Sequence, residues 1–153
     1  MSNAPRAWRL LLSHDDPAAA LRWSREHNRI ALGWGRIGHV VARGLDSERA
    51  IADAINHAYP GLGSASRGGK ALYQFVYELQ VGDLVVLRSK RNEAVVRVVG
   101  EYRLAAAGEP LLGSGYDHQR AVAFVRDDPT DFWRKYGGLG PGSPYCPFLP
   151  MAR

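Results

Sequence analysis

The segment 81–102, VGDLVVLRSKRNEAVVRVVGEY, constrains the fold of this chain more than any other. Its runs 84–87 and 94–99 are apolar at nearly every position, and a polar stretch separates them. Two such runs around a polar turn are typical of an antiparallel hairpin, and apolar residues on both faces indicate strands covered on both sides. Gly82 supplies a turn before the first strand, and Gly100 indicates a bulge or bend in the second. We therefore expect a hairpin at the centre of a sheet, with a basic, solvated tip.

The length of 153 residues suits a single domain with a core of its own. No apolar run approaches the roughly 20 residues that a membrane span requires, and no charged-then-apolar leader opens the chain. The single cysteine, Cys146, allows no internal disulfide and favours a reducing compartment. We expect a cytoplasmic protein without a membrane partner.

The remaining segments mix helices and strands without βαβ alternation. We expect strands at 6–13, 30–32 and 116–125, and helices at 16–27, 47–59, 72–79 and 131–136. The Gly- and Ser-rich segment 60–70 predicts a mobile loop that carries Arg67 and Lys70. The pattern predicts an α+β fold, with one domain at 6–136 and a Gly/Pro-rich tail or linker at 137–153.

The net charge of +5 favours a polyanionic partner, of which nucleic acid is the usual one. Many Arg- and Ala-rich proteins are equally basic without such a partner, so charge alone leaves both interpretations open.

The segment 33–38, GWGRIG, matches the G-x-G-x-x-G pattern of dinucleotide-binding loops. That function requires a helix to begin at the third glycine, with its N-terminus facing a pyrophosphate. Residues 39–44 look extended instead, and the next helix is expected to begin only at Ser47, so we expect no dinucleotide cofactor. Trp34 stands between Gly33 and Gly35, where no neighbouring side chain blocks the indole face. It is either a stacking surface for a flat ligand or a core tryptophan in a tight turn.

Catalytic and metal-binding patterns are missing from the sequence. No serine lies in G-x-S-x-G, and no H-E-x-x-H or paired Cys/His spacing offers a metal site. We therefore expect no enzymatic activity, no cofactor and no metal. Alternation along a strand places Tyr116, His118 and Arg120 on one face, which keeps a small-molecule or enzymatic site open as an alternative.

Aromatic and basic residues fall into two candidate sets. A base pocket, lined by aromatic rings with a few polar groups, would be formed by Trp34, Phe75, Tyr102, Tyr116, His118 and Arg120. Phosphate contacts would come from Arg67, Lys70, Arg88, Lys90 and Arg91. The alternative is that the rings fill a small barrel and the charges only solvate loops.

Several short motifs occur in a familiar order between residues 8 and 125. They are IALGWG at 30–35, Leu72-x-x-Phe75 before Gly82-Asp83-x-Val85, Gly100-Glu101-Tyr102, and Tyr116-x-His118-x-Arg120-x-Val122-x-Phe124. In this order the chain resembles a PUA-like domain of the EVE/YTH-related group, of the type that reads modified bases beside restriction enzymes. The resemblance implies a small β-barrel with helices packed around it and a pocket for an extruded base. It also implies that Trp34 is a pocket wall, with Tyr102, Tyr116 and His118 near the rim.

The sequence therefore predicts a module that recognises a modified, flipped base in DNA and does not cut the strand. RNA binding is the alternative among binding modules, and a nuclease or NTPase effector subunit is an expected partner. The sequence departs from the resembled pattern at His39, where an acidic residue often follows.

Overall fold

The computed structural model describes residues 5–12, 16–107, 109, 115–126, 128–136 and 148–150. Its helical elements are α1 (Pro17–His27), the 3₁₀ turn η1 (Gly35–Ile37), α2 (Glu48–Ala58), α3 (Ser66–Tyr73), the π-helical turn η2 (Gln74–Glu78) and α4 (Pro129–Tyr136). Its strands are β1 (Ala7–Leu11), β2 (Arg29–Leu32), β3 (Leu84–Arg88), β4 (Asn92–Val98), β5 (Arg103–Leu104), β6 (His118–Val125) and β7 (Phe148–Pro150). The α+β class is confirmed.

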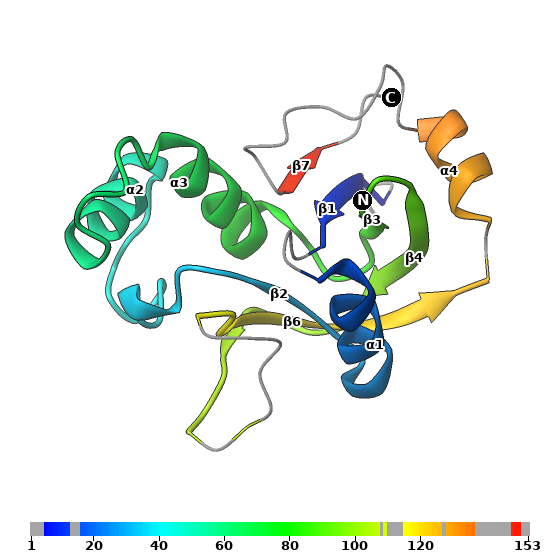
Figure 1. Cartoon of the computed structure of the whole chain (residues 1–153), viewed down its shortest axis with the longest axis horizontal. Coiled ribbons are helices and arrows are strands. Elements are labelled where there is room, and N and C mark those ends of the chain that lie inside the picture. The colour runs from blue at the N-terminus through cyan, green and yellow to red at the C-terminus, as the bar shows by residue number, and fades with distance from the viewer. Residues whose placement is uncertain are drawn as a thin grey trace.

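The strands form one mixed sheet in the order β2-β6-β4-β3-β1-β7, with β5 beside β6. β1 and β3 are parallel, and the other pairs are antiparallel. Helices α2 and α3 lie together at one end of the molecule and α4 lies at the other, with the strands between them (Figure 1). The predicted hairpin is β3–β4, and it occupies the centre of the strand order as expected.

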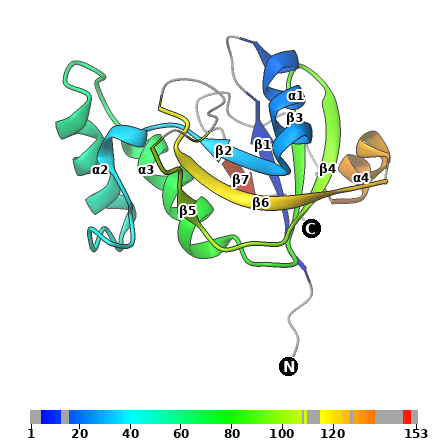
Figure 2. The same cartoon turned by 90° about the horizontal axis from the view of Figure 1, so that it is seen from below.

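The expected closed barrel is wrong. β6 curves the sheet, because its first half pairs with β2 and β5 while its second half pairs with β4. Figure 2 shows β2 lying alongside β6. Closure would require β2 to pair with β7, and these two strands are the unjoined edges of the sheet within the described residues.

Gly100 forms the bulge that the sequence indicated. The amide nitrogens of Val99 and Gly100 both donate to the carbonyl oxygen of Ala121, at 2.9 and 3.2 Å. Two successive residues therefore oppose one, which ends β4 and bends the chain. A Cβ atom on Gly100 would lie 2.9 Å from the Cβ atom of Ala121, so only glycine fits without a shift.

Asp83 joins the start of β1 to the turn before β3. Its carboxylate accepts hydrogen bonds from the Trp8 indole nitrogen, the Arg6 amide and the Gln80 amide, each at 3.0 Å. The side chain is buried, and three donors compensate for the loss of water around its charge. Trp8 is fully buried, as expected of the first strand.

Helices α1 and α2 begin where their capping residues predict. Asp16 accepts a hydrogen bond from the Ala19 amide at 3.0 Å, and Ser47 accepts one from the Ala50 amide at the same distance. Asn28 ends α1 in the left-handed conformation, which satisfies the last turn of the helix.

The prediction of a loop over all of residues 60–70 is wrong, because helix α3 begins at Ser66. Two consecutive glycines disfavour a helix in solution, but here they allow close packing. A Cβ atom on Gly69 would lie 2.6 Å from the carbonyl oxygen of Glu48, and one on Gly68 would lie 2.9 Å from the Trp34 ring. The interface with α2 and with Trp34 therefore requires glycine at both positions.

Two further segments differ from expectation. Residues 40–44 form a turn rather than extended chain, and the Leu45 amide donates to the carbonyl oxygen of Val40. At the other end of the chain, β7 pairs with β1 and thus extends the sheet from within the predicted tail. Residues 137–147 lie outside the described part. No helix in the described ranges is long and apolar enough to span a membrane.

Candidate functional site

The Trp34 turn, residues 33–38, carries the most unusual backbone of the described chain. Trp34 has φ 66° and ψ 36°, a left-handed conformation that residues with a side chain rarely adopt. Two contacts hold it there, one from the first residue of β6 and one from the segment that leads into this strand. The Nε2 atom of His118 lies 3.0 Å from the Trp34 carbonyl oxygen, and the Gly35 amide donates to the Gly115 carbonyl oxygen at 2.8 Å.

A chain of hydrogen bonds fixes the proton positions at His118. Because Nε2 faces a carbonyl oxygen, it must carry the proton, and Nδ1 of the neutral ring is then an acceptor. The Tyr102 hydroxyl, 2.8 Å from Nδ1, therefore donates to it and accepts from the Val40 amide at 3.2 Å. Burial lowers the pKa of His118, which favours this neutral ring, and burial raises the pKa of Tyr102 to about 12.

The indole of Trp34 is half-buried and lies against helix α3 at Gly68. The two glycines around Trp34 differ in their surroundings. A Cβ atom on Gly33 would have no neighbour within 4 Å, whereas one on Gly35 would lie 2.6 Å from the carboxylate carbon of Asp117. The expected open space is therefore present at Gly33 only.

Asp117 is a candidate site residue that the sequence pattern did not reveal. Alternation along the strand assigns it to the face opposite Tyr116 and His118. The missing side chain of Gly35 instead lets the Asp117 carboxylate lie directly against the Trp34 turn. This carboxylate is half-exposed and makes no hydrogen bond or ion pair with the described residues.

Two more residues beside the Trp34 turn were missed. Arg36 is exposed, its guanidinium lies 4.9 Å from the Tyr59 ring centroid, and its amide donates to the Tyr59 hydroxyl. The His39 ring meets the Tyr102 ring edge-on, with centroids 4.8 Å apart. Arg36 lies in the 3₁₀ turn at 35–37 and His39 directly precedes the turn at 40–44, and the sequence predicted neither turn.

Phe75 and Arg120 lie in the core, and in this conformation they offer no surface to a ligand. Phe75 is fully buried and Arg120 is 1% exposed. The Arg120 Nη1 atom donates to the carbonyl oxygens of Phe75 and Leu79, and Nε donates to that of Gly100. Arg120 therefore links the π-helical turn η2 to the bulge after β4. The prediction that Phe75 and Arg120 line an open base pocket is wrong, because both side chains are buried in the core.

The remaining expected pocket residues form one group. Trp34, Tyr102 and His118 are joined by the hydrogen bonds described above, although the His118 side chain itself is fully buried. Tyr116 is half-buried at the start of the same strand, and its hydroxyl makes no hydrogen bond to the described residues.

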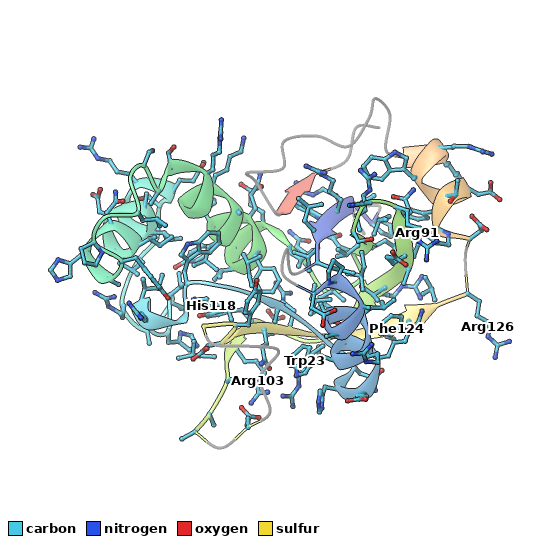
Figure 3. All side chains as sticks on the ribbon, viewed as in Figure 1. Trp23, Arg91, Arg103, His118, Phe124 and Arg126 are labelled. Atoms are coloured by element: carbon cyan, nitrogen blue, oxygen red, sulfur yellow. The ribbon has the colours of Figure 1, made fainter. Side chains whose placement is uncertain are left out.

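The expected phosphate contacts fall into two groups at different ends of the molecule. Arg67 and Lys70 are exposed on α3, the helix against which Trp34 packs. Lys90 and Arg91 are exposed at the tip of the β3–β4 hairpin. Figure 3 shows Arg91 far from His118, and the length of β6, roughly 25 Å for eight residues, separates the two groups.

Arg88 was expected to contact phosphates with the other basic residues, but its side chain is buried. It is 9% exposed, and its guanidinium lies 4.4 Å from the centroid of the Trp133 ring on α4. The register shift between Leu87 and Arg88 in the hairpin places it beside Asn92.

The segment 33–38 does not have the backbone of a dinucleotide-binding loop. The third glycine of the 33–38 motif follows a 3₁₀ turn and opens no helix, so the N-terminal dipole that a pyrophosphate needs is missing there. No group of three His, Cys, Asp or Glu side chains in the described part is arranged to hold a metal ion.

Comparison with curated proteins finds no match, and comparison with solved structures finds none either. Residues 8–136, which include every described helix and all strands except β7, match one family. The span begins inside β1 and ends with α4, so it coincides with the body of the fold. The chain belongs to the family described as Domain of unknown function (DUF8426).

Proposed function

We propose that this protein is a nucleic-acid-binding module that stacks an extruded base of DNA on Trp34 and performs no chemical step on it. The observation that carries the proposal is the strained, half-buried indole held at the surface by His118 and Gly115. A left-handed conformation at a bulky residue costs of order 1–3 kcal/mol, and such strain clusters at ligand-binding sites. A tryptophan that only fills the core would not require a strained backbone.

The energetics of base extrusion suit this surface. Unstacking and unpairing a base costs a few kcal/mol, and stacking on an aromatic ring returns about 1–3 kcal/mol. The part of the extrusion cost that stacking does not offset must come from phosphate contacts. Two exposed cations lie on the segments that flank the indole: Arg36 in the Trp34 turn, and Arg67, the residue before Gly68 on α3. Lys70 lies about 200° around the helix from Gly68 and is less well placed.

The base edge would be read by Asp117. A carboxylate accepts hydrogen bonds, and among the bases the exocyclic amino groups of cytosine and adenine are the matching donors. The resemblance to modified-base readers of the EVE/YTH-related PUA-like group adds the expectation that the base is modified. It also adds a nuclease or NTPase effector as the partner that acts on the DNA, in a cytoplasmic setting that the single cysteine favours.

The alternative of an enzymatic or small-molecule site at His118 and Arg120 gains no support. Both side chains are buried, both ring nitrogens of His118 have hydrogen-bond partners, and Arg120 donates to three backbone carbonyls. RNA binding stays an alternative, because stacking on an indole does not distinguish the two sugars.

The test is a binding panel at one fixed salt concentration. Fluorescence anisotropy compares labelled duplex DNA, single-stranded DNA and RNA of one sequence, with cytosine, adenine, thymine or guanine and their methylated forms at the central position. We expect the tightest binding to DNA with a modified cytosine or adenine. Tighter binding to RNA would favour the alternative module, and no binding to any strand would contradict the proposal.

A further inference from the structure

Two buried arginines share the face of the sheet that α4 covers. Arg9 of β1 pairs with Val86 of β3, and Arg88 follows two residues later on the same face. Val86 packs against Phe132 of α4 in a small cluster separate from the main core. Arg9 is 3% exposed and Arg88 is 9% exposed, so two positive charges are buried on this face of the sheet, and that of Arg88 lies against Trp133 of α4.

The described contacts of the Arg88 guanidinium replace only part of the hydration that it loses on burial. Its Nε and Nη1 atoms are buried and form no hydrogen bond with the described residues, although its guanidinium lies against Trp133. A stacked ring provides cation–π attraction but accepts no hydrogen bond in the plane of the guanidinium. Burial accordingly lowers the pKa of Arg88. Arg120 differs in degree: its Nε and Nη1 atoms donate to three carbonyl oxygens, and only its Nη2 atom is buried without a hydrogen bond to the described residues.

Among the described residues, the polar groups nearest to Arg88 do not neutralise it. The acid of the same hairpin, Glu93, accepts hydrogen bonds from the Ser89 hydroxyl at 2.7 Å and from the Arg91 Nε atom at 3.2 Å. Asn92, which pairs with Arg88 across the hairpin, has a buried Oδ1 atom that no described residue bonds. A carboxamide can rotate to present its NH₂ group, so Asn92 can also donate to an anion.

We propose that Arg88, stacked on Trp133 and flanked by Asn92, is a binding site for a phosphate group. A buried guanidinium with unbonded donors requires an acceptor, and a phosphate oxygen is one that arginine recognises well. The phosphate comes either from free inorganic phosphate or from the terminal monoester of a nucleic acid. This site lies at the hairpin end of β6, away from Trp34, and does not depend on base recognition there.

The test measures phosphate binding by calorimetry and by thermal unfolding, in phosphate and in chloride at matched ionic strength. We expect phosphate to raise the Tm of the native protein and of the control Arg91→Met, which removes an exposed cation of the same hairpin. In Arg88→Met, binding should weaken about 10- to 100-fold, the equivalent of losing one hydrogen bond to a charged group. Its Tm in chloride should equal or exceed that of the native protein, because a buried charge is gone.

An equal phosphate effect in Arg88→Met, or none in the native protein, would overturn the site. If Arg88→Met does not fold, Arg88→Lys keeps the charge but loses the planar donors, and it should bind phosphate at least about 10-fold more weakly. Oligonucleotides with a 5′-phosphate or a 5′-hydroxyl distinguish the two sources. Competition with inorganic phosphate by the first alone indicates a terminal monoester, and competition by neither indicates free phosphate.

Discussion

The Nε2 atom of His118 lies 3.0 Å from the carbonyl oxygen of Trp34, so a fully buried strand residue fixes the backbone of a half-buried tryptophan. The bond crosses 84 positions of the chain and joins β6 to the Trp34 turn. The other ring nitrogen of His118 is bonded to Tyr102, which also binds the turn at Val40. The backbone geometry of the candidate surface therefore depends on the hydrogen bonds of the buried His118 and the half-buried Tyr102.

Replacing Tyr102 with Phe should destabilise the fold. The change leaves the Val40 amide without its acceptor and His118 Nδ1 without its donor. We expect a loss of about 1–3 kcal/mol in the free energy of unfolding, measured with urea. Tyr116→Phe is the matched control and should change this free energy by less than about 0.5 kcal/mol. Equal effects of the two changes would show that the Tyr102 hydroxyl contributes nothing.

Acid should weaken the fold through His118. Burial holds the pKa of His118 below its ordinary value of about 6.5. Below that value the unfolded chain binds a proton that the folded chain refuses, so stability falls as the pH drops toward the folded pKa. Protonation would also turn Nδ1 into a donor facing the Tyr102 hydroxyl. The contribution of the neutral His118 ring to the free energy of unfolding should be complete above about pH 7 and decline at lower pH.

The measurement compares urea unfolding of the native protein and His118→Gln between about pH 8 and pH 5. The stability advantage of the native protein should shrink as the pH falls. NMR titration of the His118 ring provides a second readout if the variant does not fold. A ring that becomes protonated at or above its ordinary pKa would contradict the prediction.

Replacing Gly68 with Ala should displace the indole. Alanine favours a helix by about 1 kcal/mol over glycine, so the change would stabilise an unobstructed helix. Here the new Cβ atom would lie 2.9 Å from Cζ2 of Trp34. We expect lower stability and greater quenching of tryptophan fluorescence by iodide. Gly33→Ala is the control, because its Cβ atom meets no neighbour within 4 Å. A Gly68→Ala protein with higher stability and unchanged quenching would place the indole elsewhere.

The two groups of exposed cations should differ in their dependence on ligand length. On a duplex of about 20 base pairs, Lys90 and Arg91 changed together to Ala should lower the slope of log affinity against log salt by about 0.9 per lost contact. The same should hold for Arg67 and Lys70. On a single strand of about four nucleotides, only the second pair should matter, because the strand is too short to follow β6 to the hairpin. An unchanged slope for the hairpin pair on the duplex would remove the tip from the interface.

The sequence predicted the helices and strands whose formation depends on residues close together in the chain. The β-branched runs gave the β3–β4 hairpin, and the capping residues Asp16 and Ser47 placed the starts of two helices. Helix α3 was missed because Gly68 and Gly69 serve packing against distant residues, which no local propensity records. The open sheet was missed for a similar reason, since closure depends on the pairing of strands far apart in the sequence.

The candidate site was predicted in part. The Gly-Trp-Gly pattern singled out Trp34, and alternation brought Tyr116 and His118 to one strand end. Alternation also grouped Arg120 with them, and only the structure shows that its charge is taken up by core carbonyls. Asp117 became a candidate only because its carboxylate lies in the space that the missing side chain of Gly35 leaves. These two residues are 82 positions apart in the sequence, so no local pattern shows their contact.

The most direct test of base stacking is Trp34→Ala, with melting temperature and oligonucleotide affinity measured on the same protein. We expect a folded variant that loses about 1–3 kcal/mol of binding, the range for base–aromatic stacking, together with its preference for the modified base. The salt dependence from the basic residues should stay. A loss of about 3–5 kcal/mol in stability would instead mark Trp34 as a core residue. A variant of native stability that binds and discriminates like the parent would contradict the proposed function.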